Sequence, residues 1–145
     1  MRLAGALALA LLVCTATAGA TSIARVTLPE MERASTVVVV AEVKTLSSGD
    51  GLDEYQLEPE RFLRGGPSRR VTLSAPPLPG IALGLERGGR YLVFAERRTF
   101  FGRWNRLTVV GYPQGVYRML GDLRAVNEPN GMIVLKRLSA RLGNA

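Results

Sequence analysis

A run of valines followed by alternating residues is the feature of this sequence that most limits its fold. Residues 36–45 read TVVVVAEVKT, and four consecutive β-branched valines disfavour a helix and favour a strand. The alternation then places Val39, Ala41 and Val43 on one side and the charged residues between them on the other. The segment therefore predicts a strand that is buried on both faces at its start and on one face at its end.

Further short strands follow at regular intervals, each bounded by glycine, proline or polar residues. Turn signals stand at residues 47–51 (SSGDG), at Gly88-Gly89 and at Asn130-Gly131. Pro59 predicts an edge or a bulge in the second strand, because proline has no amide proton. Strands are expected at residues 36–45, 54–63, 70–75, 90–96 and 107–112, with further strands at 116–120 and 132–138. This pattern is typical of a small barrel rather than a parallel α/β sheet.

One short helix is expected before the first strand. Thr27 is a good N-cap, Glu30 completes a capping box, and Pro29 is tolerated in the first turn. The β-branched residues from Thr36 onward end this helix. The last residues, 140–145, are expected to be a frayed end.

The first twenty residues have the pattern of a secretory signal peptide. A basic residue at position 2 is followed by an apolar stretch at residues 7–13. Ala18-Gly19-Ala20 then supplies the small residues that signal peptidase accepts. We expect residues 1–20 to be a signal peptide and residues 21–145 to form a single domain in the periplasm or outside the cell.

Two other roles of this segment stay open, a transmembrane anchor and lipidation of Cys14. The apolar stretch is short for a bilayer span of ~20 residues. Lipoprotein signals prefer a small residue before the cysteine, and here it is Val13. Cleavage after residue 20 removes the only cysteine, which suits an oxidising compartment. It also leaves no second apolar run long enough to span a bilayer.

Much enzymatic chemistry is excluded, because the sequence contains no histidine. Neither a Ser-His-Asp triad nor a His-ligated metal is available. Asp50, Asp53 and Glu54 lack the spacing of a calcium-binding loop. Glu58 and Glu60 share a predicted strand face, which we interpret as a solvated face rather than a glycosidase pair. We therefore expect no catalytic residues, no metal, no cofactor and no enzymatic activity.

Charge is divided unevenly along the expected mature chain. Residues 21–60 contain three basic and eight acidic residues, whereas residues 61–145 contain fifteen basic and four acidic ones. Such a division fits a basic face that meets a polyanion or an anionic membrane. It fits equally a fold in which acidic and basic strands lie side by side and neutralise each other.

The order of these elements resembles the OB-fold of netrin-like modules, the family that includes tissue inhibitors of metalloproteinases. The resemblance rests on a short helix ending at Ala34-Ser35, the buried strand at 37–43, EPERFLRG at 58–65 and GGRYLVF at 88–94. The segment GYPQGVYRM at 111–119 is similar to the tail of an uncharacterised secreted bacterial subgroup of this family.

The resemblance covers about residues 28–120 and implies an all-β fold. The implied architecture is a small five-stranded OB-like barrel with a short N-terminal helix and one or two extra C-terminal strands. The matching motifs are apolar and turn residues, which indicate fold rather than activity. Metalloproteinase inhibitors chelate their target's zinc through an amino-terminal cysteine, whereas the expected mature chain begins at Thr21. That inhibitory chemistry therefore does not carry over.

Residues 97–106 (RRTFFGRWNR) form the most informative local feature, with four arginines and three aromatic residues between the expected fourth and fifth strands. In OB-folds the loop at this place borders the ligand face. Guanidinium groups bind phosphate or sulfate, and aromatic rings stack on bases or sugars. The expected binding residues are Arg97, Arg98, Phe100, Phe101, Arg103, Trp104 and Arg106, helped by Arg69 and Arg70 if the third strand lies nearby. The alternative is a long hairpin whose rings pack back on the barrel while its arginines stay solvated.

These features together predict a secreted, non-enzymatic binding module for an anionic glycan, a lipid surface or an acidic protein. Nucleic acid is not expected, because a secreted protein rarely meets it as a cognate ligand. The alternative is an accessory or inhibitor protein of a secreted protease that acts without metal chelation. An exposed strand near Val116 or Met132 is a further candidate for pairing with a partner chain.

Overall fold

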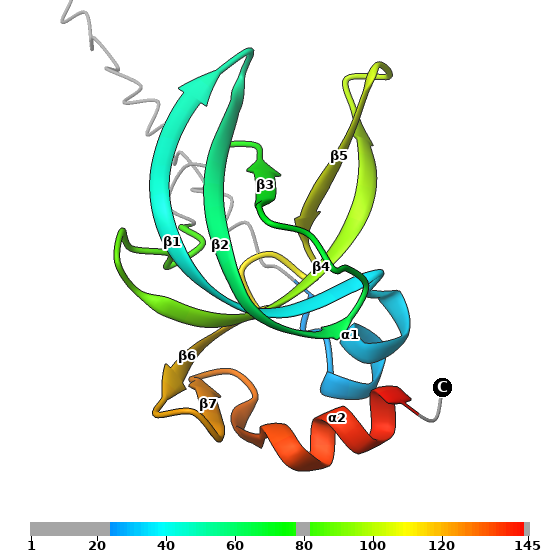
Figure 1. The fold of residues 1–145 in the computed structure, drawn as a ribbon. Coiled ribbons are helices and arrows are strands. Elements are labelled where there is room, and N and C mark those ends of the chain that lie inside the picture. Colours follow the sequence, from blue (N-terminus) through cyan, green and yellow to red (C-terminus); the bar gives the residue numbers. More distant parts are fainter. Residues whose placement is uncertain (1–23, 78–81, 144–145) are drawn as a thin grey trace, which may run out of the picture.

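The computed structural model describes residues 24–77 and 82–143, which form one antiparallel sheet and two helices (Figure 1). The expected signal peptide and Cys14 lie outside these described residues. In chain order the elements are α1 (Leu28–Ala34), β1 (Val37–Gly49), β2 (Leu52–Arg64), β3 (Val71–Ala75), β4 (Arg90–Phe100), β5 (Trp104–Val109), β6 (Val116–Leu120), β7 (Arg124–Asn127), β8 (Gly131–Val134) and α2 (Leu135–Gly143). Neither helix is long and apolar enough to cross a bilayer.

The sheet is strongly curled, so that it forms half of a barrel (Figure 1). Its strand order is β3-β2-β1-β4-β6-β7-β8, and β5 pairs with a separate part of β4. Residues 91–93 of β4 pair with β6, whereas residues 95–100 pair with β5. β3 and β5 lie close together, but no ladder of hydrogen bonds joins them in the described chain. This arrangement leaves a seam in the barrel wall.

The hairpin β1–β2 forms one side of the half-barrel. The strand predicted at 36–45 is confirmed but is longer, because most of the expected turn at 47–51 is paired with β2. Asp50 and Gly51 alone form the turn, and both have positive φ, as in the tightest hairpins. The register shifts beside Pro59, so the bulge predicted there is confirmed.

The sheet separates two apolar cores. Val39, Ala41 and Val43 of β1 point into the barrel core, which they share with residues of β2, β3, β4 and β5. Val38 and Val40 point to the opposite face, into a helix-side core that also contains residues of α1, β4, β6, β7, β8 and α2. The start of β1 is therefore apolar on both faces because each face covers a different core.

Helix α1 begins and ends as its sequence predicts. The Glu30 carboxylate accepts hydrogen bonds from the amide and the hydroxyl of Thr27, both at 2.7 Å. These bonds stabilise the charged carboxylate and lower the pKa of Glu30. After the helix, the buried Ser35 hydroxyl donates to the Met31 carbonyl at 2.5 Å, and the chain enters β1.

The C-terminal segment differs from the prediction. The strand expected at 132–138 ends at Val134, and α2 takes the place of both its second half and the expected frayed end. Leu135, Leu138 and Leu142 recur at helical spacing and are buried in the helix-side core. Their burial stabilises the helix in place of any capping residue at its start.

The fold is mostly β, as predicted, but it contains an unexpected second helix and more strands than the five to seven foreseen. Eight strands are present in the described ranges. The additional strand β7 lies in a polar stretch where only Ala125 is fully buried, so its sequence carries little alternation. Strands expected at 54–63, 70–75, 90–96, 107–112 and 116–120 correspond to β2, β3, β4, β5 and β6.

Candidate anion-binding groove

The arginine-rich segment 97–106 is part of a β-hairpin rather than the expected loop. β4 continues to Phe100 and β5 begins at Trp104. The short turn between them is closed by the Arg103 amide, which donates to the Phe100 carbonyl at 3.1 Å. Aromatic residues favour strands, and arginine is compatible with a solvent-exposed strand. The alternative of a long hairpin therefore describes the backbone of this segment correctly.

The strand register separates the predicted binding residues, because Arg98 lies directly opposite Arg106 on one face of the hairpin and Arg97 belongs to the other face. Arg97 and Arg106 nevertheless both line a groove beside β3, at the edge formed by β5. Arg98 forms an ion pair with Glu96, with 2.9 Å between Nε and a carboxylate oxygen. Together with the half-buried Phe100, Arg98 lines a different groove.

Three further predicted residues lie at or near the hairpin tip. The Phe101 side chain is 64% exposed. Its ring lies 3.8 Å from the position that a Cβ on Gly51 would occupy, so the tip approaches the β1–β2 turn. Arg103 lies in the turn, and Trp104 begins β5 opposite Phe100. The seven residues predicted as one surface therefore occupy several places.

The groove that contains Arg97 and Arg106 lies at the seam between β3 and β5. It has a volume of about 370 Å³. Arg70, the residue before β3, also lines it, so the third strand does lie near the arginine-rich segment. Arg97 comes from β4 and Arg106 from β5. Two segments that are distant in sequence, residue 70 and the β4–β5 hairpin, therefore bring arginines to one groove.

These three arginines have no ion pair within residues 24–77 and 82–143. By contrast, Arg90 binds Glu60 at 2.7 Å and Asp122 at 2.9 Å. The guanidinium lowers the pKa of Glu60, and the two carboxylates raise the pKa of Arg90.

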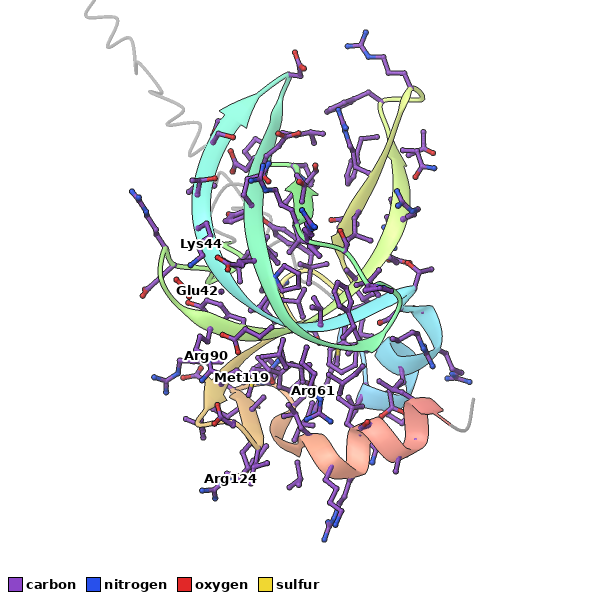
Figure 2. The ribbon with its side chains drawn as sticks, in the orientation of Figure 1. Glu42, Lys44, Arg61, Arg90, Met119 and Arg124 are labelled. Carbon is purple, nitrogen blue, oxygen red and sulfur yellow. The ribbon has the colours of Figure 1, made fainter. Side chains whose placement is uncertain are left out.

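Pairing between the acidic and basic parts of the chain is therefore real but partial. Arg141 of α2 binds Glu32 of α1 at 2.7 Å, and Arg90 binds Glu60 across the same division. Figure 2 shows Arg90 on the same side of the molecule as Glu42 and Lys44. The groove arginines are outside these pairs, so no carboxylate offsets their charge in the described chain.

Polar side chains complete the groove. Ser68, Thr72 and Asn105 line it, and the Asn105 side-chain amide can donate hydrogen bonds to an anion. The Ser68 hydroxyl instead donates to the Arg70 carbonyl at 2.7 Å, and the Thr72 hydroxyl donates to the Gln56 side-chain oxygen at 3.2 Å. Ser74 lies in the groove wall, and its hydroxyl is buried without a hydrogen-bond partner in the described chain. The groove thus combines three arginines without a carboxylate partner and the amide of Asn105, which is the chemistry that binds sulfate, phosphate or carboxylate groups.

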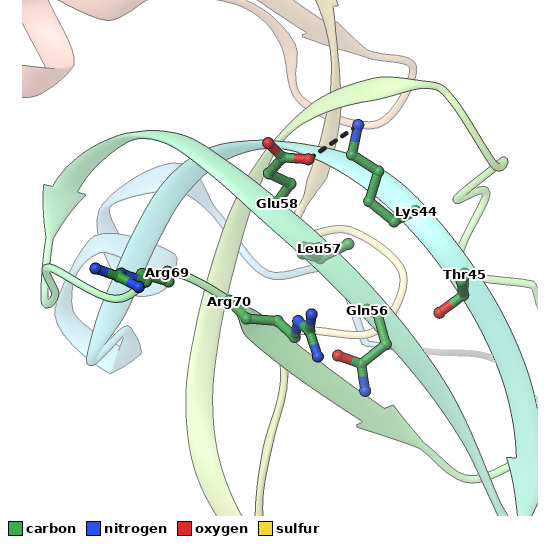
Figure 3. Close-up of a pocket in the computed structure, with 7 residues that line it drawn as sticks. All are labelled: Lys44, Thr45, Gln56, Leu57, Glu58, Arg69 and Arg70. Carbon is green, nitrogen blue, oxygen red and sulfur yellow. Dashed lines mark ion pairs between the residues drawn. The ribbon is translucent and has the colours of Figure 1, made fainter.

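A second groove lies on the neighbouring strands and contains Arg69 (Figure 3). Its volume is about 280 Å³, and Arg70 lines it as well. Here the basic residue Lys44 is bound to Glu42 and Glu58, each at 3.0 Å, and both carboxylates raise the pKa of Lys44. These carboxylates repel an anionic ligand, so the second groove is the poorer candidate for an anion-binding site.

Three of the acidic residues weighed as metal or catalytic candidates have ordinary partners. Asp53 accepts a hydrogen bond from Ser48 at 2.5 Å, and Glu58 and Glu60 form the ion pairs described above. Among the described residues there is no group of three or more Cys, Asp or Glu side chains that could hold a metal ion.

Comparison with known proteins identifies no relative: no family model matches the chain, and no curated protein matches it. The site therefore rests on its geometry. Sequence reasoning missed Thr72, Ser74 and Asn105, because isolated polar residues in strands carry no signal of their own. Only the closeness of β3 and β5 brings them to the arginines.

Proposed function

We propose that this chain is a secreted, non-enzymatic binding module whose groove between β3 and β5 binds an anionic glycan. The observation that carries the proposal is the grouping of Arg70, Arg97 and Arg106 without a carboxylate partner for any of them in the described ranges. Guanidinium forks match the geometry of sulfate and carboxylate groups. A groove between strands suits a chain or a projecting group better than a flat lipid surface.

The proposal includes an OB-like barrel of the netrin-like kind. Strands β1 to β5 follow the order β3-β2-β1-β4-β5, and β3 and β5 approach each other. This order supports a five-stranded, partly open barrel, in which the sheet face and the hairpin loops beside it bind ligands. The signal-peptide pattern of residues 1–20 supports export to the periplasm or the exterior.

Calorimetric titration with heparin, a sulfated glycan, tests this function. We expect the double variant Arg97→Ala/Arg106→Ala to bind heparin at least tenfold more weakly, because a hydrogen bond to a charged group contributes roughly 1.5–3 kcal/mol. The control Arg61→Ala/Arg87→Ala removes the same charge from exposed positions outside the groove. It should change the affinity by less than about threefold.

Two results would count against a groove-specific site. One is an equal loss of heparin affinity in both double variants, which would show that only net charge matters. The other is binding that persists unchanged up to molar salt, because electrostatic binding must weaken as ions screen it.

A further inference from the structure

The outer face of β6, β7 and β8 is a second surface without an assigned role. On the inner face Tyr117, Met119, Ala125 and Ile133 are buried in the helix-side core, together with residues of both helices. The opposite face consists of the alternate residues of the three strands, which are Arg118, Leu120, Arg124, Val126, Met132 and Val134. None of these six is fully buried.

Apolar side chains on this face are unusually exposed. Met132 is 55% exposed and Val134 is 37% exposed, while Leu123, in the turn before β7, is 66% exposed, and we call these three residues the β8 patch. Met132 lies directly opposite Val126, so the apolar surface continues onto β7. Clustered exposed apolar side chains mark surfaces that meet a partner.

β8 is also the free end of the strand order. It pairs with β7 on one side, and no described strand pairs with its other side. Its sequence, GMIV, contains neither lysine nor proline, the residues by which proteins usually protect a free edge. Backbone donors and acceptors along such an edge can bind an extended chain as an added strand.

The charges around the β8 patch are mostly positive. Exposed basic side chains without an ion pair in the described chain are Arg118, Arg124, Lys136 and Arg137. Figure 2 shows Arg124 projecting outward below the half-barrel. The nearby Asp122 is bound to Arg90, so it does not offset these cations. An acidic partner therefore complements this surface.

We propose that the free edge of β8 docks an extended, acidic segment of a partner protein as an added strand. The partner's apolar side chains would cover Met132 and Val134, while its carboxylates would meet Arg124 and the basic start of α2. A second copy of this chain is disfavoured, since pairing two β8 edges brings the same cations together. A membrane is disfavoured, because a bilayer interior cannot satisfy the unpaired backbone of the edge.

The test uses a fluorescent eight-residue peptide in which Glu and Val alternate, followed by anisotropy. The variant Met132→Glu/Val134→Glu places two negative charges on the patch. We expect it to weaken peptide binding at least tenfold, because these charges repel the carboxylates of the peptide. Leu46→Glu is the control for a carboxylate added elsewhere and is matched to the single variant Met132→Glu, because Leu46 is 57% exposed and lies on β1 outside the patch. It should leave the affinity unchanged. Circular dichroism checks both folds, and the single variant Met132→Glu replaces the double one if the latter does not fold.

A second peptide tests the backbone pairing itself. N-methylation of alternate residues removes amide donors from one edge of the peptide, and we expect it to abolish binding. The proposal would be overturned if the methylated peptide bound as tightly as the unmethylated one. It would also be overturned if Leu46→Glu lost as much peptide affinity as the variants of the β8 patch. The absence of peptide binding at millimolar concentration would also overturn the proposal. In that case, binding of phosphatidylglycerol vesicles would point to a membrane, and a dimer in sedimentation that Met132→Glu dissociates would point to a second copy of this chain.

Discussion

At the scale of single residues, two buried serines differ in whether the hydroxyl has a partner. The Ser35 hydroxyl donates to the Met31 carbonyl, whereas the Ser74 hydroxyl has no hydrogen-bond partner in the described chain. Both side chains are at least 95% buried. A buried polar group without a hydrogen bond costs free energy, so removing it relieves that cost.

The same substitution should therefore have opposite effects at these two positions. We expect Ser74→Ala to raise the free energy of unfolding by about 1 kcal/mol and Ser35→Ala to lower it by about 1 kcal/mol. Urea denaturation followed by circular dichroism measures both changes. A loss of stability in Ser74→Ala as large as that in Ser35→Ala would contradict the assignment of an unpaired hydroxyl.

At the scale of elements, α2 is held to the sheet by its apolar stripe. Leu138 is fully buried, while Leu123, in the turn before β7, is 66% exposed. We expect Leu138→Ala to lower the free energy of unfolding by about 3 kcal/mol, because it opens a cavity in the helix-side core. Leu123→Ala should change it by less than about 0.5 kcal/mol. Urea denaturation compares the two, and equal effects would mean that α2 is not packed as described.

Most strands could be predicted because their own residues alternate. β3 has one apolar side chain at every second position, β1 begins with four valines and alternates from Val39 to Lys44, and a turn signal precedes β4. α2 could not be predicted in the same way. It follows β8 directly without a capping residue, and its stripe of Leu135, Leu138 and Leu142 covers only two turns. The apolar run from Met132 onward therefore fits a strand equally well.

The candidate groove was predictable only in part. The chemistry of Arg97 and Arg106 is visible in the sequence, because arginines and aromatic residues are concentrated there. Strand pairing places Arg97 on one face of the hairpin and Arg98 with Arg106 on the other, which a segment expected as a loop does not reveal. Arg70 joins them only because β3 and β5 meet at the seam, and that contact links residues far apart in the chain.

At the scale of the whole molecule, β1 and β4 belong to both cores. Alternate residues of each strand point to opposite faces, so neither core can form without them. We expect the protein to unfold in one cooperative transition. Leu73→Ala in the barrel core and Leu138→Ala in the helix-side core should each lower its single midpoint.

Hydrogen exchange under native conditions tests this coupling independently. The slowest amides of β3 and β6 should exchange with the same free energy of opening, because both depend on global unfolding. Two separate transitions, with each substitution moving only one of them, would contradict the shared-strand arrangement.

The two proposed binding surfaces also belong to different parts of the sheet. The groove lies between β3 and β5, whereas the docking edge is β8, at the other end of the strand order from β3 (Figure 1). A ligand in the groove therefore leaves the edge of β8 open. The arrangement suits a protein that holds a glycan and a protein partner at the same time.

The four consecutive valines of β1 have a consequence for how the chain encodes its alignment. If β1 were shifted by one residue against its neighbouring strands, valine would replace valine on both faces across most of residues 37–40. This stretch therefore contributes little to setting the register. The register of β1 must therefore be set by the residues on either side of the four valines. Ser35 fixes the entry to the strand through α1, and Glu42, if moved by one position, would bring its carboxylate into the barrel core. The most recognisable segment of the sequence is thus the least informative about its own position.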